Sequence, residues 1–237
     1  MSGPATQLHP TAQLAPRVLL AGDPGRALQL ATELLDRPLM FNHARGLWGY
    51  TGMAADEDLL TIQATGIGGA SAALVVNELC ALGMQTAIRI GTAWAGDAGP
   101  QLGTLIAVSA AHAGDGASRA LGAADLVVAD QALADALTAW GPAATVTSGD
   151  LTPDLAQLEP GSVRDLSTAA VLAAAAGHSV RAAAVLAIAH TPTGHLDGQG
   201  LRDAASALGR AAAGALGIPQ RSVAPLPPPR EDAATRP

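Results

Sequence analysis

The sequence predicts a single α/β domain in which a central mixed β-sheet is flanked by helices. Short runs of aliphatic and β-branched residues alternate along the chain with alanine-rich stretches of helical length. Several of the short runs end in glycine-containing turns. Of the 237 residues, 49% are hydrophobic, and a chain of this composition can bury a sizeable core.

The apolar runs predict strands and the alanine-rich stretches predict helices, in the following order along the chain. The first strand is followed directly by the turn signal Gly22-Asp23-Pro24-Gly25, and the first helix starts after it. The second strand leads into a glycine-rich loop, 65–69, and the third ends at Gly91-Thr92. Apolar runs of strand length occur at 18–21, 59–64, 86–90, 105–109, 144–147 and 183–189. Stretches of helical composition occur at 26–35, 70–82, 131–140, 165–176 and 201–216.

The predicted elements place one domain at residues 17–217. Residues 1–16 form an N-terminal arm in this assignment. From Ile218 the chain becomes rich in proline. A terminal segment of that composition is typical of a loose linker, so we expect residues 218–237 to be a flexible tail.

Composition excludes several kinds of chemistry. The chain has no lysine, so all 13 positive charges are arginines, which rules out a P-loop lysine or a lysine Schiff base. Cys80 is the only cysteine, which rules out an intrachain disulfide and a multi-cysteine zinc site. His112 and His178 show no metal-ligand spacing with it, and we expect neither a metal nor an organic cofactor.

Charge and hydropathy indicate the surroundings of the protein. The net charge of −7 has the wrong sign for a protein that coats nucleic acid. The N-terminus has no basic region followed by an apolar run, and the most apolar stretch, 167–189, is interrupted by His178 and Arg181. We therefore expect a cytoplasmic protein that binds neither nucleic acid nor membranes. Any anion that it binds must be held by a local cluster of arginines.

Three glycine-containing loops follow predicted strands, at 22–26, 65–69 and 89–92. Ligands of α/β sheets collect at the carboxyl ends of the strands. Glycine lets backbone N–H groups approach an anion, and Arg26 and Arg89 add forked guanidinium donors. One such loop is a common structural turn, but the three together indicate an anion site.

Four segments carry a resemblance to a known family. They are Val-Leu-Leu-Ala-Gly-Asp-Pro-Gly-Arg at 18–26, Asn-His-Ala-Arg-Gly-Leu-Trp-Gly-Tyr-Thr-Gly at 42–52, Ala-Thr-Gly-Ile-Gly-Gly-Ala-Ser at 64–71 and Arg-Ile-Gly-Thr at 89–92. In this order they resemble the nucleoside phosphorylase-I family, which contains uridine phosphorylases, hexameric purine nucleoside phosphorylases and related nucleosidases. The similarity is clear over about 18–109 and weaker to 216. It implies a nucleoside phosphorylase-like fold.

The resemblance implies phosphorolysis of a nucleoside, in the first place a uridine-like pyrimidine nucleoside, to free base and ribose 1-phosphate. Inorganic phosphate is then the co-substrate, and Arg89 has a catalytic role because a fixed phosphate dianion stabilises an oxocarbenium-like transition state and attacks it. Arg45 and His9 would reach the site of a neighbouring subunit, in a dimer or a trimer of dimers. The implied phosphate ligands are Gly22, Arg26, Arg45, Arg89 and Thr92.

The second half of the chain departs from the family on the sugar side. The family has a Glu-Met-Glu segment whose second glutamate binds the ribose hydroxyls, and this chain has Asp165, Leu166 and Ser167 there. Ser167 cannot make the bidentate carboxylate contact, which is worth about 1.5–3 kcal/mol for a charged hydrogen bond. We expect Asp165 to be a shorter substitute with a catalytic role, and all three residues to contact substrate.

The base side departs as well. Asp150 lies in a segment that usually presents an aromatic ring, and it is a candidate substrate ligand here. Trp94 stands where the family has glycine, and it either stacks on the base or plugs the pocket as core. Pro192 stands near the position of a proton-donating aspartate, so His190 or His195 is the candidate for a new general acid.

Two alternatives to a phosphorylase stay open. The chain can be a family member that has lost catalysis and serves as an anion-binding, metabolite-binding or partner subunit, as Ser167 and Pro192 suggest. It can also be a nucleosidase-type hydrolase, although a hydrolase that uses water does not need Arg26, Arg45 and Arg89 together.

Overall fold

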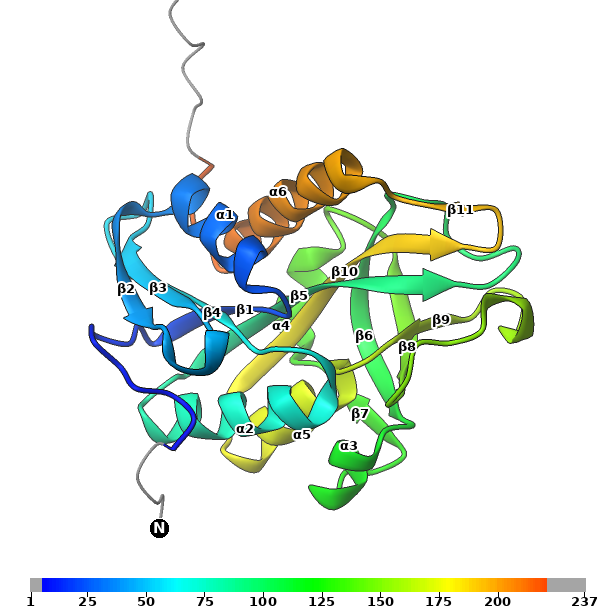
Figure 1. Ribbon diagram of the computed structural model, residues 1–237, viewed down its shortest axis with the longest axis horizontal. Helices are drawn as coiled ribbons and strands as arrows, with labels where there is room; N and C mark the ends of the chain where they lie inside the picture. Colours follow the sequence, from blue (N-terminus) through cyan, green and yellow to red (C-terminus); the bar gives the residue numbers. More distant parts are fainter. Residues whose placement is uncertain (1–5, 221–237) are drawn as a thin grey trace, which may run out of the picture.

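A computed structural model describes residues 6–220 of the chain (Figure 1). It shows one α/β domain with a mixed sheet and helices on its faces, which confirms the predicted fold class. The strands are β1 (Arg17–Ala21), β2 (Asp36–Asn42), β3 (Gly49–Met53), β4 (Leu59–Ala64), β5 (Thr86–Ala95), β6 (Leu105–Ala113), β7 (Leu126–Val128), β8 (Ala143–Ser148), β9 (Val163–Asp165), β10 (Arg181–Thr191) and β11 (Gly194–His195).

The helices form two layers. Helix α1 packs against α6 on one face of the sheet, and α2 packs against α5 on the other (Figure 1). The α-helices are α1 (Pro24–Leu34), α2 (Gly68–Ala81), α3 (Gly116–Ala120), α4 (Gln131–Leu137), α5 (Thr168–Gly177) and α6 (Gly198–Ala215). Two short 3-10 helices, η1 (Ala44–Gly46) and η2 (Leu155–Gln157), lie in loops.

Strands β1, β4 and β5 are parallel neighbours, and this places the glycine loops 22–26 and 65–69 beside residues 89–92, which lie within β5 and not in the loop that the sequence predicted. Ala21 at the end of β1 is in register with Ala64 at the end of β4 and with Ile90 of β5. The loops that leave these strands therefore start at one edge of the sheet, which is where ligands of α/β sheets bind. Their hydrogen bonding agrees, because the Thr65 backbone N–H donates to the Ala21 carbonyl oxygen at 2.7 Å.

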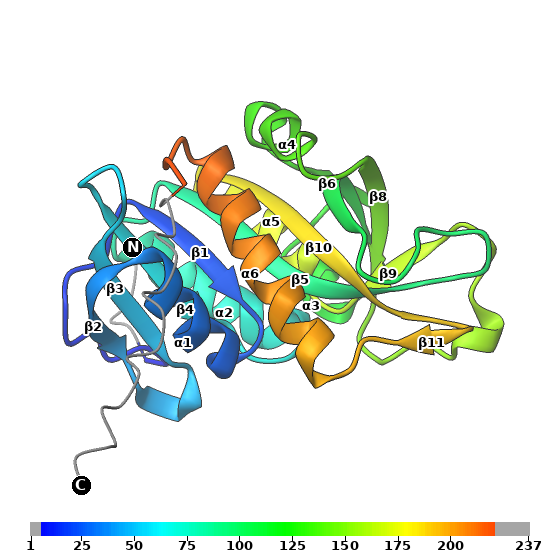
Figure 2. The same cartoon turned by 90° about the horizontal axis from the view of Figure 1, so that it is seen from above.

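Strand β5 is ten residues long and belongs to two parts of the sheet. Its first part pairs in parallel with β1 and β10, and its last residues, Trp94 and Ala95, pair antiparallel with β9. Pairings of β10 with β6, of β6 with β8 and of β8 with β9 complete a closed ring of five strands. The antiparallel strands β2 and β3 extend the opposite end of the sheet (Figure 2).

Several predicted boundaries were wrong, and the elements missed altogether are short or exposed. The predicted helix 165–176 starts only at Thr168, because Asp165 ends β9 and its carboxylate accepts a hydrogen bond from the Thr168 backbone N–H. Strand 86–90 continues to Ala95. The sequence assignment omitted β2, β3, β7, β9, β11, α3 and both 3-10 helices. Five of the seven residues of β2 are exposed, so that strand has no run of buried positions to mark it.

Both chain ends contact the domain where the structure describes them. The backbone N–H groups of Thr6, Gln7 and Leu8 donate to the Glu78 carboxylate at 2.8, 2.9 and 2.8 Å, which ties the arm to α2. Ile218, assigned to the tail from the sequence, is buried in the core. The rest of the predicted tail, from 221, lies outside the described residues. No helix within 6–220 is both long and apolar enough to cross a membrane.

Gly141 lets the start of β8 pass close to β6, and its replacement tests that packing. A Cβ at this position would overlap the backbone carbonyl oxygen of Leu105, which cannot rotate away. We expect Gly141→Ala to lower the free energy of unfolding by about 1–3 kcal/mol, as overpacking does. The measurement is the midpoint of thermal unfolding by circular dichroism.

The matched control is Gly177→Ala, at the end of α5, where an added Cβ meets open space. Alanine is a better helix former than glycine, so this variant should unfold at the same temperature as the wild type or higher. A Gly141→Ala protein as stable as Gly177→Ala would contradict the close approach of the two strands.

Candidate functional site

A cavity of about 370 Å³ opens where the loops after β1 and β4 and the second half of strand β5 meet the start of α5. Its wall combines the three glycine loops predicted as an anion site with the segment after β9. The lining residues are Gly22, Asp23, Pro24, Arg26, Gly66, Ile67, Gly68, Arg89, Gly91, Thr92, Trp94, Leu166 and Ser167. Sequence reasoning named Gly22, Arg26, Arg89, Thr92, Trp94, Leu166 and Ser167 of these.

Two helices begin at the cavity. Asp23 caps α1 by accepting a hydrogen bond from the Arg26 backbone N–H at 2.7 Å. Helix α2 has no side-chain cap, and Gly66 and Gly68 in front of it have φ of +74° and +80°, a conformation that favours glycine. The uncapped N–H groups of α2 therefore remain as donors at the cavity, where the helix dipole also favours an anion.

The cavity wall carries two guanidinium groups, Arg26 and Arg89. Burial lowers the pKa of Arg26, and the positive charge of Arg89 lowers it further, while Asp23 offsets part of the effect. No carboxylate among residues 6–220 lies within ion-pair distance of Arg26. The Arg26 charge thus faces a second cation without a direct counter-ion of its own.

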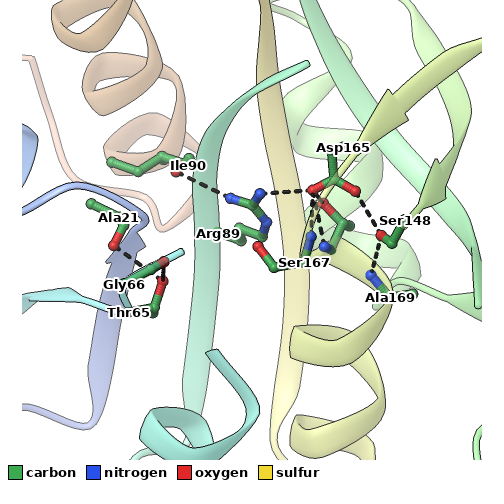
Figure 3. Close-up of polar contacts among 10 residues, drawn as sticks. Ala21, Thr65, Gly66, Arg89, Ile90, Ser148, Asp165, Ser167 and Ala169 are labelled. Atoms are coloured by element: carbon green, nitrogen blue, oxygen red, sulfur yellow. Dashed lines mark hydrogen bonds and ion pairs between the residues drawn. The ribbon is translucent and has the colours of Figure 1, made fainter. Parts of the chain in front are cut away.

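Arg89 is 6% exposed and uses only part of its hydrogen-bonding capacity. Its Nη2 donates to the Asp165 carboxylate at 2.7 Å, and its Nη1 approaches the Ile90 carbonyl oxygen at 3.4 Å (Figure 3). Its Nε is buried and has no partner within the described chain. A buried N–H without an acceptor is costly, so this atom calls for an acceptor that the protein itself does not supply.

Gly91 makes room for the Arg89 side chain. A Cβ on Gly91 would overlap the Arg89 guanidinium at Nη1. The glycine after Ile90 therefore has a steric reason to be present, besides the usual freedom of a loop. Sequence reasoning placed Gly91 in a loop of the predicted anion site, whereas it lies inside β5.

Asp165 is held behind Arg89 rather than on the cavity wall. Its carboxylate accepts from Arg89, from Ser148 Oγ at 2.6 Å and from Thr168 Oγ1 at 2.7 Å, and also from the Ser167 and Thr168 backbone N–H groups (Figure 3). Burial alone would raise the pKa of Asp165, but the Arg89 charge and these hydrogen bonds outweigh it and keep the pKa below 3.8. The carboxylate predicted as a sugar ligand is occupied by the protein's own donors.

Ser148 and Thr168 are members of this network that sequence reasoning did not single out. Ser148 Oγ donates to Asp165 and accepts from the Ala169 backbone N–H at 2.9 Å, so it joins β8 to α5. A threonine three residues after an aspartate at a helix start was a readable capping signal. The position of Ser148 opposite Asp165 follows from strand pairing and carries no local signal.

Three predicted substrate residues lie outside the cavity of this chain. Arg45 is exposed and adopts φ of +57° within η1. His9 is exposed, and its backbone N–H donates to Asn42 Oδ1 at 2.8 Å. Asp150 is exposed and accepts from the Gly116 backbone N–H. Within one subunit the structure does not bring these side chains to the phosphate loops.

Comparison with known proteins relates this arrangement to a family. A model of the phosphorylase superfamily matches residues 16–218. The chain belongs to the phosphorylase superfamily. A solved superfamily structure, uridine phosphorylase from Vibrio fischeri ES114 in complex with 6-hydroxy-1-naphthoic acid, is 25% identical to it with a TM-score of 0.73. That match covers 86% of this chain and 90% of the other.

Curated relatives in the superfamily match over a shorter region. The DeoD-type purine nucleoside phosphorylase of Geobacillus kaustophilus is 41% identical over 83 residues, which are 35% of each chain. The DeoD-type enzyme of Exiguobacterium sibiricum is 38% identical over 104 residues, 42% of this chain and 43% of that one. The chain thus matches less than half of the length of these relatives.

The Arg89–Asp165 pair yields a prediction about stability and pH. Asp165→Asn leaves Arg89 buried without its counter-charge, so we expect a loss of about 3–5 kcal/mol at neutral pH. The folded pKa of Asp165 lies below its unfolded value, so its ionised form stabilises the protein above about pH 4. The stability difference between wild type and variant should shrink as the pH falls below that value. Urea unfolding at a series of pH values measures it.

Asp203→Asn is the control, because it makes the same chemical change at an exposed carboxylate of α6. It should change the stability little at any pH. A difference between wild type and Asp165→Asn that stays constant down to pH 2–3 would show that the charge of Asp165 does not cause the stabilisation.

Proposed function

We propose that this superfamily member is a nucleoside phosphorylase in which the cavity binds inorganic phosphate beside the sugar of a nucleoside. The observation that carries the proposal is the unbalanced cationic wall, with Arg26 and Arg89 in one cavity and a partnerless Arg89 Nε. A dianion with several oxygens supplies the missing acceptors, and guanidinium groups suit phosphate geometry. The names of the matched relatives, purine nucleoside phosphorylases and a uridine phosphorylase, support the same chemistry.

In this proposal phosphate lies between the two arginines and the loop backbones. Gly22 and Thr92, which border the cavity, add a close-approaching backbone and a hydroxyl donor. The uncapped start of α2 adds N–H groups and a favourable dipole. These donors fix the anion before reaction, so little reorganisation remains when charge develops.

The reaction exchanges one bond of the sugar for another. The bond from C1′ to the base nitrogen breaks, the base leaves with its electron pair, and a phosphate oxygen forms the new bond to C1′. The base takes up one proton as it leaves, and hydrogen phosphate loses one as it becomes the ester, so that the two exchanges through water balance. Because C1′ gains positive charge in between, a fixed phosphate dianion on one face stabilises the transition state and then attacks.

We assign Asp165 as a positioning residue for Arg89, in place of the expected sugar ligand. The carboxylate is fully engaged with donors of the protein, and it directs Nη2 of Arg89 away from the cavity. Nε is left without a protein acceptor, and because it is buried, the Arg89 side chain would have to shift for this atom to reach a phosphate oxygen. On the sugar side, Leu166 and Ser167 form the wall.

The cavity has room for phosphate and a nucleoside, and a pyrimidine nucleoside is the smaller of the two substrate classes. About 370 Å³ is near the lower end of the range for ligand pockets, and phosphate with a pyrimidine nucleoside needs less space than with a purine one. We therefore propose a uridine-like substrate, with Trp94 available on the wall to stack on the base. A purine nucleoside, as in the names of the curated relatives, is the competing substrate class.

Arg45 and His9 fit a site completed by a second subunit. Arg45 keeps a left-handed backbone conformation that arginine rarely adopts, at a position where its own chain gives the side chain no partner among the described residues. Ile67 borders the cavity and is 85% exposed, and Leu39 and Trp48 are also exposed. A homodimer, alone or within a trimer of dimers, would cover such residues and deliver Arg45 of the partner subunit.

One observation favours a second candidate, an anion-binding subunit without turnover. Asp23 is the only acidic residue on the cavity wall in the described chain, and it caps α1. No carboxylate is thus left there to bind the ribose hydroxyls. Such a protein would bind phosphate or a phosphorylated metabolite and release no base. A nucleosidase, the third possibility, would release base without phosphate.

The deciding experiment measures base release from uridine, thymidine, inosine and adenosine, with and without inorganic phosphate. We expect phosphate-dependent release, highest for uridine. Arg89→Ala and Arg26→Ala should lower kcat/KM about ten- to a hundredfold, because each removes a charged contact to phosphate. Arg210→Gln on α6, outside the cavity, should keep full activity.

Other outcomes lead to other functions. Phosphate-independent release would indicate a hydrolase, and no release with tight phosphate binding by calorimetry would indicate the anion-binding subunit. Full activity of Arg89→Ala would contradict the phosphate site.

A mixing experiment tests whether Arg45 acts between subunits. Arg45→Ala and Arg89→Ala should each be nearly inactive. When the two are unfolded together and refolded as mixed dimers, about a quarter of the sites regain an intact set, because half of the dimers are mixed and each has one complete site. Recovery of about that activity supports sharing. No recovery, with mixed dimers shown by mass spectrometry, would place Arg45 outside the shared site.

A further inference from the structure

Three rings form a stack that starts at the cavity. Trp94 lines the cavity, and the His190 ring stacks on its indole with centroids 5.6 Å apart and planes at 16°. The His195 ring stacks on His190 with centroids 6.0 Å apart and planes at 26°. Trp94 borders the cavity, and His190, which stacks on it, is not among the lining residues.

An irregularity in β10 creates this stack. Strands β10 and β5 pair regularly up to Ile188, opposite Ala93, and then the register shifts so that His190 lies opposite Trp94. In a regular ladder Ala189 would face Trp94, and His190 would point to the other side of the sheet. Bulges of this kind re-aim a side chain next to functional sites. The hairpin to β11 then pairs His190 with His195.

The row contains no acidic group. Across the strands the residues in register are His195, His190, Trp94 and then Arg164 of β9. His190 is half-buried and His195 is exposed at the end of the row. A chain with only five aromatic residues places one of its three tryptophans here and stacks a histidine on it.

We propose that His190 is a positioning residue that fixes the Trp94 indole as the flat wall against which the substrate base stacks. The inference rests on the proposed binding of a nucleoside in this cavity and adds the group that sets the wall. A free indole at the end of β5 could turn across the pocket. With its other face covered by His190, it keeps one orientation and selects planar heteroaromatic rings.

This role differs from general acid catalysis by His190. A general acid must come within hydrogen-bond reach of the leaving base. Trp94 contributes to the cavity wall where His190 does not, so the indole separates the imidazole from the base. A positioning role needs only a flat ring at position 190, whereas a general acid needs an imidazole that can give up a proton.

The first test reads the stack without any activity. In a Trp48→Phe, Trp140→Phe background Trp94 is the only tryptophan, and a protonated imidazole quenches indole emission more than a neutral one. Emission should fall as the pH is lowered through the His190 transition. Burial and the charge of His195 hold the pKa of His190 below 6.5. His195→Gln should therefore shift the transition upward, and His190→Phe should abolish it.

The second test separates positioning from acid catalysis. His190→Ala should raise KM for the nucleoside roughly two- to tenfold, the worth of one aromatic pair. It should change kcat less than about twofold, because stacking is shared by ground state and transition state. His190→Phe, which keeps a ring, should restore the wild-type KM.

The outcomes are decisive in each direction. A pH-independent Trp94 emission, or a kcat lowered about a hundredfold in both His190→Ala and His190→Phe, overturns the inference, the latter in favour of a general acid. If no nucleoside is cleaved, titration of Trp94 emission with uridine or uracil still decides it. If the ligand quenches Trp94 emission less in His190→Ala but not in His190→Phe, the inference that His190 positions the indole is supported. If the ligand does not quench Trp94 emission, the inference is overturned.

Discussion

The ion pair between Arg89 and Asp165 holds together the parts of this fold that meet at the cavity. Arg89 lies on β5, and Asp165 ends β9 and accepts a hydrogen bond from the backbone N–H of Thr168, the first residue of α5. Ser148 adds β8 to the same cluster. Removing two charges from water is unfavourable, and such a pair is stable only when further hydrogen bonds satisfy it. Asp165 meets that condition fully, whereas Arg89 leaves Nε without a partner. Asp165 is therefore engaged entirely with the protein, whereas Arg89 retains hydrogen-bonding capacity that the protein does not use.

The sequence predicted the elements whose hydrophobic residues recur with the period of a strand or a helix. The buried runs of β1, β4 and β10 and the amphipathic α1 and α6 were readable, because their patterns follow the period of the element. The glycine loops 22–26 and 65–69 were readable because each follows a strand directly, whereas 89–92 proved to be part of β5. Parallel pairing of β1 with β4 and β5 then brings them to one edge. Strands such as β2 and β9 were missed because they are exposed or only three residues long.

The contacts of the site depend on pairing that no local pattern reveals. Asp165 was recognised as a replacement for a glutamate, but its partner Arg89 is 76 residues away, and the resemblance indicated a sugar rather than an arginine. The stack of His190 on Trp94 depends on a register shift in β10. The alanine-rich sequence of β10 contains no proline or glycine to mark that shift. The fold and the glycine loops were thus predictable, and the contacts behind Arg89 and Trp94 were not.

The absence of lysine has a consequence for how the cavity responds to its solution. Guanidinium groups stay protonated throughout the range in which proteins are folded, even when burial lowers their pKa. The electrostatic attraction that Arg26 and Arg89 exert is therefore constant with pH. If the cavity binds an anion, a change of its affinity with pH would come from the ionisation of the anion or of Asp23, which is the carboxylate on the cavity wall within the described residues. Because the two arginine charges stay constant, the strength with which the cavity attracts a ligand depends mainly on the charge of that ligand.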